Sequence, residues 1–392
     1  MIMTGLGVSF LLVCFFIISL FLYMLRSRNI HIWFSAYVLH LLKRKIQIEA
    51  TPIYIFFCVV DHFEPRWNHA TYEQECQRVD IWVKQYPIMA LNHRDSRGRP
   101  YQHTFFYPEE EYRTEHLDKL ARIHKNGFGD VEIHLHHNND TSQNLRETLI
   151  RFKTILHDTH GLLHKNRDTG NVEYGFIHGN WALDNSRPDG KWCGVNDELI
   201  ILRETGCYAD FTYPSAPDVT QTQKINSIYY ATDDPQQPKS HNTGIDVEVN
   251  RPPSGDLMII QGILTLNWRT RKWGIFPRIE NSELSGDNPP VSSRVDLWIQ
   301  QHIHVSGQPK WIFVKLHTHG AQEENCNMLL GEPMNKMLSY LETTYNDGIH
   351  YKLYYVTARE LYGLIKAAEK GENKEPDQIL EQMYADGGNI HS

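Results

Sequence analysis

Residues 131–140 read VEIHLHHNND, a short apolar–polar alternation that ends in a cluster of polar side chains. Because successive side chains of a β-strand point to opposite faces, His134 and His136 would project to one side, together with Glu132. Burying imidazole and carboxylate groups is costly unless they have polar partners. A divalent metal ion is such a partner, and histidine with aspartate suits zinc, iron or manganese. The alternative is a surface strand that is histidine-rich by chance in a chain with 22 histidines.

Other apolar stretches of the chain also end in polar residues. Residues 53–60 are continuously apolar and rich in aromatic and β-branched side chains, which is typical of a strand buried on both faces. Asp61 and His62 follow this stretch directly. Further strands are predicted at 104–108, 174–177, 257–266, 311–316 and 351–356, with another strand end at 210–214.

Helical patterns separate these strands. They are predicted at 72–85, 109–126, 145–160, 197–205 and 357–369. Gly206 suits the left-handed cap of the fourth helix, and Thr357 with Glu360 forms a capping box at the start of the last. Residues 218–256 are rich in Pro, Asp, Asn, Gln and Ser and predict an elaborate loop.

Strands that alternate with helices and end in polar clusters predict an α/β fold, a single (β/α) barrel. In such a barrel the carboxyl ends of the strands converge on one mouth. Residues that are distant in sequence could then share one site. The candidates are Asp61, His62, His134, His136, His178, Asp210 and His317.

The N-terminal segment differs from the rest of the chain. Residues 2–25 are almost entirely apolar and carry no charge; at 1.5 Å per residue they would span a bilayer core of roughly 30 Å. No basic residue precedes them and no small-residue cleavage site follows, so we expect a retained transmembrane helix rather than a signal peptide. Arg26, Arg28 and the basic residues at 43–45 follow, and the positive-inside rule then places the soluble domain on the cytoplasmic side.

These patterns divide the chain into four parts. Residues 1–28 are predicted to form the single-pass membrane anchor, and 29–50 a juxtamembrane helix. This second segment could lie on the membrane surface or be the first helix of the core. Residues 51–369 would form the barrel, and 370–392 a polar C-terminal tail.

Composition excludes some functions. The net charge is −8 and no basic stripe interleaved with aromatic residues is present, which argues against a nucleic-acid partner. The six cysteines are scattered without CxxC pairs, a pattern that favours reduced thiols over a disulfide framework.

The order of these motifs resembles the polysaccharide deacetylase family, the metal-dependent esterases and amidases of the NodB-homology barrel. Over about 51–365, the similar segments are the first strand end at 60–62, the TFF strand at 104–106, the E-I-x-x-H strand at 132–136, the L-x-x-x-G segment at 202–212 and the last motif at 315–317. The resemblance implies a barrel of the glycoside hydrolase/deacetylase type. The chain also resembles uncharacterised proteins encoded among exopolysaccharide-synthesis genes.

The chain departs from the family pattern at three motifs. His62 stands where the family has its second acid, and Asp140 where it has its second metal-binding histidine. The Arg-x-Pro of the third motif is replaced by residues 178–181, His-Gly-Asn-Trp. These changes keep metal-ligand character but alter the charge of the site, so the chain looks like a divergent branch whose substrate cannot be taken from the chitin or peptidoglycan enzymes.

The resemblance and the residue types together assign candidate roles. A divalent metal ion, zinc first and iron, manganese, cobalt or nickel as alternatives, would polarise a carbonyl group and lower the pKa of its bound water. We expect that not all candidates bind at once, and that His137 points outward. The metal ligands would come from His62, His134, His136 and Asp140, and Glu64 could compete with His62.

The remaining candidates concern proton transfer and the substrate. Asp61 would be the base; alternatively, it is only a structural carboxylate in a loop or at a helix cap. His317 would be the general acid, and His319 could take that role instead. The residues expected to bind the sugar, or in the case of Asp210 to orient a ligand, are His178, Asn180, Trp181 and Asp210.

The predicted function is removal of an acyl group, N-acetyl first, from a polysaccharide or lipid-linked glycan precursor. The expected partners are this substrate, the lipid bilayer through the N-terminal helix, and polysaccharide-synthesis machinery. A glycoside hydrolase is the first alternative, and it would need two carboxylates about the scissile bond, taken from Glu64, Asp184 or Asp210. A non-catalytic component of a polysaccharide-synthesis complex and an HxH-type metal phosphoesterase are the others.

Overall fold

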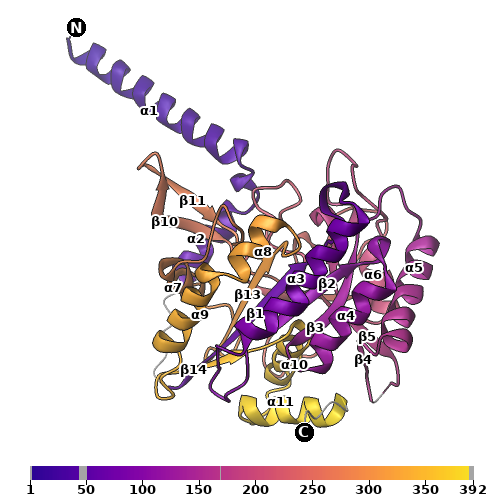
Figure 1. Cartoon of the computed structure of the whole chain (residues 1–392). Helices are drawn as coiled ribbons and strands as arrows, with labels where there is room; N and C mark the ends of the chain where they lie inside the picture. The colour runs from indigo at the N-terminus through magenta and orange to yellow at the C-terminus, as the bar shows by residue number, and fades with distance from the viewer. Residues whose placement is uncertain (1, 44–50, 168, 388–392) are drawn as a thin grey trace.

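A large, mostly parallel β-sheet forms the centre of the molecule, with helices packed around it (Figure 1). The computed structural model describes residues 2–43, 51–167 and 169–387, and the side chains of 2–11, 13, 17, 43, 386 and 387 lie outside this description. The ends of the predicted juxtamembrane segment (44–50) and of the predicted tail (388–392) also lie outside the described residues.

The parallel strands follow the predicted order along the chain. They are β1 (Ile53–His62), β2 (His103–Pro108), β3 (Gly129–Leu135), β5 (Val172–His178), β6 (Cys207–Asp210), β9 (Leu257–Ile260), β12 (Glu283–Leu284), β13 (Trp311–Thr318) and β14 (Tyr351–Tyr355). The antiparallel additions are β4 (His164–Lys165), β7 (Ile228–Ala231) and β8 (Ile245–Asp246). The order of neighbours is β12-β13-β1-β2-β3-β5-β6-β9-β7-β8, with β14 also beside β1. The predicted α/β class is therefore confirmed.

Helices follow most of the strands, and several begin at capping side chains. Thr71 and Thr357 each form a capping box at the start of a helix, and Gly206 ends another with a left-handed φ of 103°. The helices of the domain are α3 (Tyr72–Ala90), α4 (Thr114–Lys125), α5 (Ser142–Thr154), α6 (Glu198–Thr205), α7 (Ser292–Gln300), α8 (Glu323–Leu329), α9 (Glu332–Thr344), α10 (Ala358–Glu369) and α11 (Pro376–Gly387).

The register of the sheet brings the polar strand ends to one edge. His317 of β13 lies opposite Val60 of β1, and His134 of β3 lies opposite Ile177 of β5. Among the described residues no ladder joins β12 to β8, but Lys315 of β13 donates to the carbonyls of Phe211 and Tyr213, both at 2.6 Å. This buried lysine links two distant parts of the sheet.

The strand predicted at 257–266 is two strands in the structure, β9 and the start of β10 (Thr265–Lys272). The chain bends between them at Gly262, where an added Cβ would lie 2.6 Å from the carbonyl oxygen of Lys315. β10 then pairs with β11 (Phe276–Glu280) as a separate hairpin. The loop predicted at 218–256 also contains the two short strands β7 and β8.

Two helices form the N-terminal region. α1 (Ile2–Ser27) projects away from the domain (Figure 1). Among the described residues, none of the helices combines the length and the apolar character that crossing a bilayer requires. α2 (Phe34–Lys43) packs on the domain, because Trp33 and Tyr37 are buried in a small apolar cluster with Ile225 and Leu264. Of the two interpretations of this segment, the packing matches a helix of the core.

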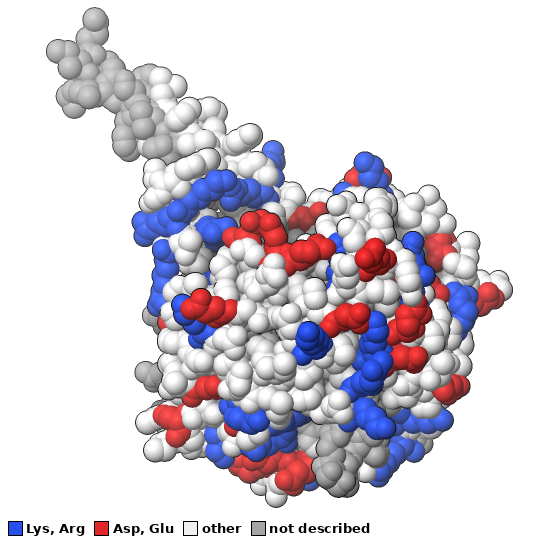
Figure 2. Space-filling view, viewed as in Figure 1, with Lys and Arg blue, Asp and Glu red and all other residues white. Residues whose placement is uncertain are grey.

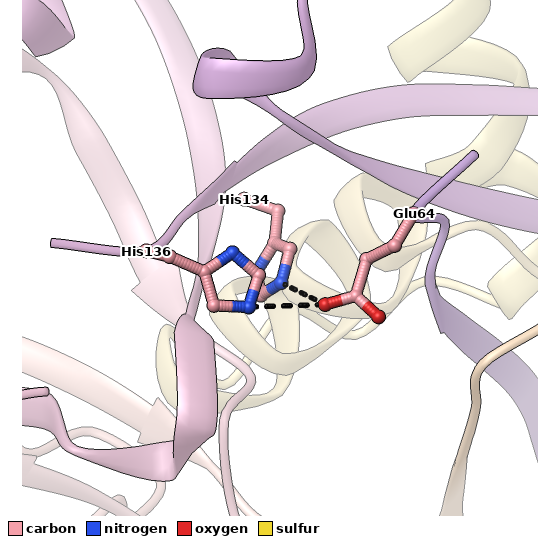
Figure 3. Close-up of side chains that lie close together, drawn as sticks. All are labelled: Glu64, His134 and His136. Atoms are coloured by element: carbon pink, nitrogen blue, oxygen red, sulfur yellow. Dashed lines mark hydrogen bonds and ion pairs between the residues drawn. The ribbon is translucent and has the colours of Figure 1, made fainter. Parts of the chain in front are cut away.

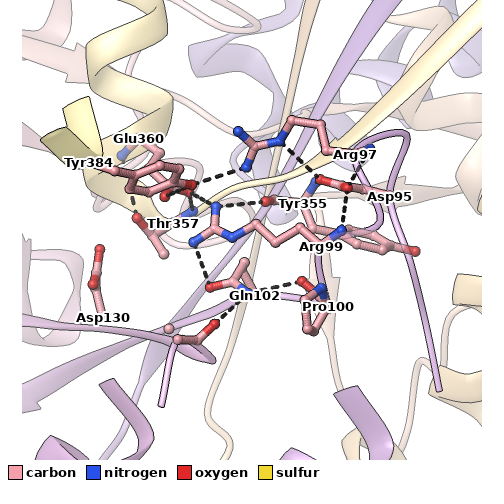
Figure 4. Close-up of polar contacts among 12 residues, drawn as sticks. Asp95, Arg97, Arg99, Pro100, Gln102, Asp130, Tyr355, Thr357, Glu360 and Tyr384 are labelled. Atoms are coloured by element: carbon pink, nitrogen blue, oxygen red, sulfur yellow. Dashed lines mark hydrogen bonds and ion pairs between the residues drawn. The ribbon is translucent and has the colours of Figure 1, made fainter. Parts of the chain in front are cut away.

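A polar network holds the C-terminal helices to the opposite end of β2 (Figure 4). Arg99 donates to Glu360 of α10 at 2.6 Å and to Gln102 at 3.0 Å, and Arg97 donates to the Tyr384 hydroxyl of α11 at 3.1 Å. The predicted tail thus contributes a packed helix, since its residues 376–387 form α11.

Candidate metal centre and cavity

Glu64, His134 and His136 converge at the carboxyl end of the sheet (Figure 3). The Glu64 Oε1 atom lies 3.3 Å from His134 Nε2 and 3.0 Å from His136 Nε2. The predicted strand ends just before His136, and both imidazoles lie on the same side as expected. His134 is fully buried, so the alternative of a surface strand is wrong.

The other nitrogen of each ring is fixed by an oxygen acceptor. His134 Nδ1 lies 2.8 Å from the carbonyl oxygen of Ile177, and His136 Nδ1 contacts the carboxylate of Glu110. These acceptors favour a proton on Nδ1 and leave Nε2 directed at Glu64. Metal-binding histidines in proteins show this arrangement, in which an outer acceptor sets the tautomer and the ring orientation.

Two further atoms at this site, one on the neighbouring His62 and one on Glu64 itself, could also bind a cation. His62 Nε2 and Glu64 Oε2 are buried and have no hydrogen-bond partner. The His62 ring lies 5.0 Å from the His134 ring and stacks on His319 at 4.6 Å between centroids. A buried polar atom without a partner is costly, so these two atoms favour a cation nearby. The ligand atoms close enough to share one ion are those of Glu64, His134 and His136, a carboxylate and two imidazoles that suit a divalent ion such as zinc.

The charges of the cluster follow from burial and from its own hydrogen bonds. Burial opposes ionisation of Glu64, but hydrogen bonds from His134 and His136 outweigh it and hold the pKa of Glu64 below its usual value. Burial also opposes protonation of His136, yet Glu110 and Glu64 raise its pKa to about 10. Burial, with the neighbouring histidines, lowers the pKa of His62 well below its usual value. His62 is therefore a neutral ligand at physiological pH.

A cavity of about 1370 Å³ opens in front of the cluster. Its floor includes His62, Glu64, His136 and His319, and its wall includes Asn180 and Trp181. The rim on the α1 side is basic, and Figure 2 shows Lys and Arg side chains gathered where α1 meets the domain. The basic residues of the lining are Arg28, Arg271, Lys272 and Arg278.

The prediction of Asp61 as a base in this site needs correction. β1 includes both Asp61 and His62, so their side chains point to opposite faces of the sheet. His62 faces the cluster, whereas Asp61 lies beneath α3, 2.9 Å from His103 Nε2, and accepts a hydrogen bond from the backbone N–H of Gly320 at 2.5 Å. The carboxylate is fully buried and does not line the cavity.

Asp140 and His137 also differ from prediction. The Asp140 carboxylate lies 3.0 Å from His137 Nδ1 and accepts from Thr141 and Asn144 at the start of α5, so it is not part of the Glu64 cluster. His137 does not point outward to solvent. Its Nε2 lies 3.1 Å from the buried carboxylate of Glu198.

The predicted substrate residues separate into two pairs. Asn180 and Trp181 line the cavity. His178 and Asp210 do not, and both are fully buried. Asp210 accepts from the Thr212 hydroxyl at 2.7 Å, and burial raises its pKa to about 7. The strand ends direct both side chains into the protein interior, so His178 is not placed to contact a sugar and Asp210 closes a turn with Thr212.

His317 and His319 lie on the same face, as their spacing predicts. The His317 ring lies 6.3 Å from the His62 ring, and its Nδ1 is buried without a hydrogen-bond partner. Burial, with Lys315, lowers the pKa of His317 well below its usual value. Of the two, only His319 lines the cavity.

Sequence reasoning gave little weight to Glu64 and missed Glu110, His103 and Glu198. Glu64 follows His62 by two residues, a same-face spacing that continues the strand pattern and could have indicated it. The other three come from separate segments, and nothing local in their sequence indicates their partners.

The comparisons with known proteins give a weak structural likeness and no assignment to a family. No family model and no curated protein matches the chain. Among solved structures, the 4-alpha-glucanotransferase of Thermococcus litoralis is similar over 79% of this chain and 38% of its own, at 12% identity and a TM-score of 0.34. The chain therefore spans well under half the length of that enzyme.

Proposed function

We propose that this protein is a metal-dependent hydrolase that removes an acyl group, N-acetyl first, from a sugar. The observation that carries the proposal is the convergence of Glu64, His134 and His136, with His62, at the floor of a large cavity. The mostly parallel sheet surrounded by helices, and the order of motifs that resembles the polysaccharide deacetylases, support this proposal.

In this proposal Glu64, His134, His136 and His62 hold a divalent ion, with zinc first. Such an ion supplies Lewis-acid polarisation of a carbonyl group and lowers the pKa of bound water. Water adds to the acyl carbon, the bond from that carbon to nitrogen breaks, and the products are a carboxylate and a free amine. His319 lines the cavity beside His62 and is the residue placed to transfer the proton to the departing amine.

The cavity wall suits a sugar. Trp181 offers an aromatic face and Asn180 an amide with both donors and acceptors, the combination that orients carbohydrate in binding sites. Asn180 and Trp181 adopt left-handed backbone conformations, with φ of 53° and 54°. Strained backbone at a cavity wall is common in binding sites.

We place the substrate at a membrane. Exposed apolar side chains cover the described part of α1, with Phe15 70% and Phe16 68% exposed. Beside its end, the β10–β11 hairpin exposes Trp273 (76%) and Ile275 (66%) next to the basic rim. A lipid-linked glycan precursor on the cytoplasmic side, handled together with polysaccharide-synthesis machinery, fits a single-pass protein of this layout.

The test is acetate release by the full chain, purified in detergent and loaded with Zn²⁺, from N-acetylated oligosaccharides and from a diphosphate-lipid-linked N-acetylhexosamine. We expect acetate release that a chelator abolishes and that Glu64→Gln lowers by at least a hundredfold. Glu332→Gln, an exposed glutamate on α9, is the matched control and should leave activity unchanged. New reducing ends without acetate would instead show a glycoside hydrolase.

The glycoside hydrolase alternative would take its two carboxylates from Glu64, Asp184 and Asp210, and the structure does not bring these three into one cavity. Of the candidates only Glu64 lines the cavity, whereas Asp184 and Asp210 are fully buried. Burial also raises the pKa of Asp184 to about 9. The non-catalytic alternative predicts that the chain purifies without metal and binds none.

A further inference from the structure

We propose that His137, His178 and Glu198 form a second divalent-metal site, separate from the Glu64 cluster and independent of the proposed hydrolysis. The three residues come from the turn after β3, the end of β5 and the start of α6. His178 and Glu198 are fully buried, and the His137 side chain is 7% exposed. The site would be closed to substrate and structural in character.

Three potential ligand atoms meet at this point. His137 Nε2 and His178 Nε2 lie 2.9 Å apart. Glu198 Oε1 lies 3.1 Å from the first nitrogen and 3.5 Å from the second. Ligand atoms bound to zinc at roughly 2.0–2.1 Å in a tetrahedron are about 3.3 Å apart. The observed triangle therefore has the size of one face of such a coordination shell.

The outer contacts direct lone pairs toward the centre of the triangle. His178 Nδ1 lies 2.6 Å from the carbonyl oxygen of Gly179, which can only accept, so this nitrogen carries the proton. His137 Nδ1 lies 3.0 Å from the Asp140 carboxylate, which assigns its proton in the same way. The second oxygen of Glu198 accepts from the backbone N–H of Asp184 at 2.6 Å. The 2.9 Å contact between the two Nε2 atoms needs a proton or a cation between them. A divalent cation in place of that proton would satisfy the Glu198 oxygen as well.

The Glu64 cluster has the same arrangement of oxygen acceptors behind its imidazole rings. A third group of possible metal ligands, which contains two histidines and an aspartate, does not. In both metal candidates each Nδ1 is held by an oxygen acceptor and each Nε2 points to the shared carboxylate. In the group formed by His124, Asp130 and His164, the Nδ1 of His124 itself faces Asp130 at 3.0 Å and the Gly129 carbonyl at 3.1 Å. That contact is an ordinary hydrogen-bonded pair.

An ion here would support the cavity wall. His137 adjoins His136 in the sequence, and Gly179 adjoins His178. Gly179 also contacts the His136 ring so closely that an added Cβ would lie 2.2 Å from it. A cation bound to His137 and His178 would therefore fix the two segments that position His136 and carry Asn180 and Trp181.

The first test measures bound zinc per chain in the full-length protein after loading with Zn²⁺ and removal of excess metal. Glu198→Gln should bind one equivalent less than wild type, Glu64→Gln should also bind one less, and the double variant should bind none. His160→Asn removes another buried histidine paired with a carboxylate, Asp118, and should bind as much as wild type.

The outcomes separate this inference from the proposed function. Loss of zinc in Glu198→Gln with no loss in Glu64→Gln supports the second site and contradicts the catalytic one. Unchanged zinc in a folded Glu198→Gln overturns the second site. If that variant does not fold, anomalous scattering at the zinc edge from wild-type crystals decides: a peak among His137, His178 and Glu198 supports the site, and its absence after zinc loading overturns it.

Discussion

Glu110 is a partly exposed carboxylate that holds the ring of His136 in place at the metal cluster. It contacts the Nδ1 of His136 and the backbone N–H of the same residue, so it fixes the ring whose Nε2 faces Glu64. Such outer partners typically contribute 10–100-fold to metal affinity or activity. Its neighbour Glu109, on the same turn, instead pairs with Arg151 at 2.8 Å.

We therefore expect Glu110→Gln to weaken Zn²⁺ binding by roughly 10–100-fold, because the neutral amide holds the imidazole less firmly. Competition with a zinc-sensitive dye measures the affinity. Glu109→Gln removes the same charge one residue away and should leave affinity unchanged. Equal effects of the two variants would show that only net charge matters.

Asp61 gives the second residue-scale prediction. Its carboxylate joins His103 to the turn at Gly320, so Asp61→Asn should lower the free energy of unfolding by about 1–3 kcal/mol. Zinc content should not change, and activity should fall less than tenfold. A base would behave differently, since its loss costs roughly 10²–10⁴-fold in rate with little change in stability. Denaturant unfolding and acetate release on the same samples distinguish the two roles.

At the scale of elements, two glycines let loops approach the histidines. An added Cβ at Gly179 would lie 2.2 Å from the His136 ring, and one at Gly194 would lie 2.1 Å from the His137 ring. No favourable contact is possible at such distances, so each ring must move.

Gly179→Ala should thus reduce zinc binding at the Glu64 cluster, and Gly194→Ala should reduce it at the His137 cluster. We expect at least a tenfold loss of affinity at one site in each variant, measured by metal titration. Gly190→Ala is the control: its Cβ meets open space, although a φ of 67° makes the substitution mildly destabilising. Retention of both affinities in the two test variants would contradict the close contacts.

The junction between α3 and α9 gives a pH-dependent prediction. His93 follows α3, and its Nδ1 lies 3.1 Å from Glu342 of α9, while its Nε2 lies 2.9 Å from Asn335. Burial opposes the charged ring, but these hydrogen bonds outweigh it and raise the pKa of His93. The stabilisation is therefore fully present below the ordinary pKa of about 6.5 and is lost as pH rises through the higher folded-state value.

His93→Gln should accordingly destabilise the protein by about 1–2 kcal/mol near pH 6 and by less near pH 9. Urea unfolding at the two pH values measures the difference. His350→Gln removes an exposed histidine paired with Asp347 and should show little effect at either pH. A larger loss at the higher pH would reverse the sign and refute the assignment.

At the scale of the whole molecule, the cavity joins three distant parts of the chain. The end of α1, the β10–β11 hairpin and the metal cluster all contribute to one lining. A substrate with a lipid, a phosphate and a sugar could meet each part in turn. The basic rim would contact the phosphate, with Arg271 and Lys272 as exposed contributors from the hairpin.

Reversing both charges, Arg271→Glu with Lys272→Glu, should lower kcat/KM for the diphosphate-lipid-linked substrate by at least tenfold, or about 1.4 kcal/mol. For an uncharged N-acetylated oligosaccharide the change should be less than threefold. Lys336→Glu with Lys370→Glu makes the same change in net charge away from the cavity lining and serves as control. Equal losses on both substrates would remove the basic rim from substrate recognition.

Local pattern was sufficient for most of the parallel strands and for several of the helices, but it predicted none of α7, α8 and α9. The apolar stretch at 53–60, the capping box at Thr357 and the cap at Gly206 depend on neighbours within a few residues, and the structure confirms them. The pairing of His134 with His136 on one side also follows from the two-residue period of a strand. The predicted membrane span at 2–25 remains a prediction, because much of it lies outside the described side chains.

Which polar residues share a site depended on the tertiary structure. Asp61 and His62 are adjacent, yet strand alternation sends one beneath α3 and the other into the cavity, and Asp140 accepts from Thr141 and Asn144 at the start of α5. Glu64, Glu110 and Glu198 acquire partners up to 70 residues away in sequence. The sequence by itself determined the order of the main parallel strands and the histidine-rich strand end, because those depend on local periodicity. Only the packing of the strands decided which carboxylate faces which imidazole, because hydrogen-bonding distances between remote segments are set by the register of the whole sheet.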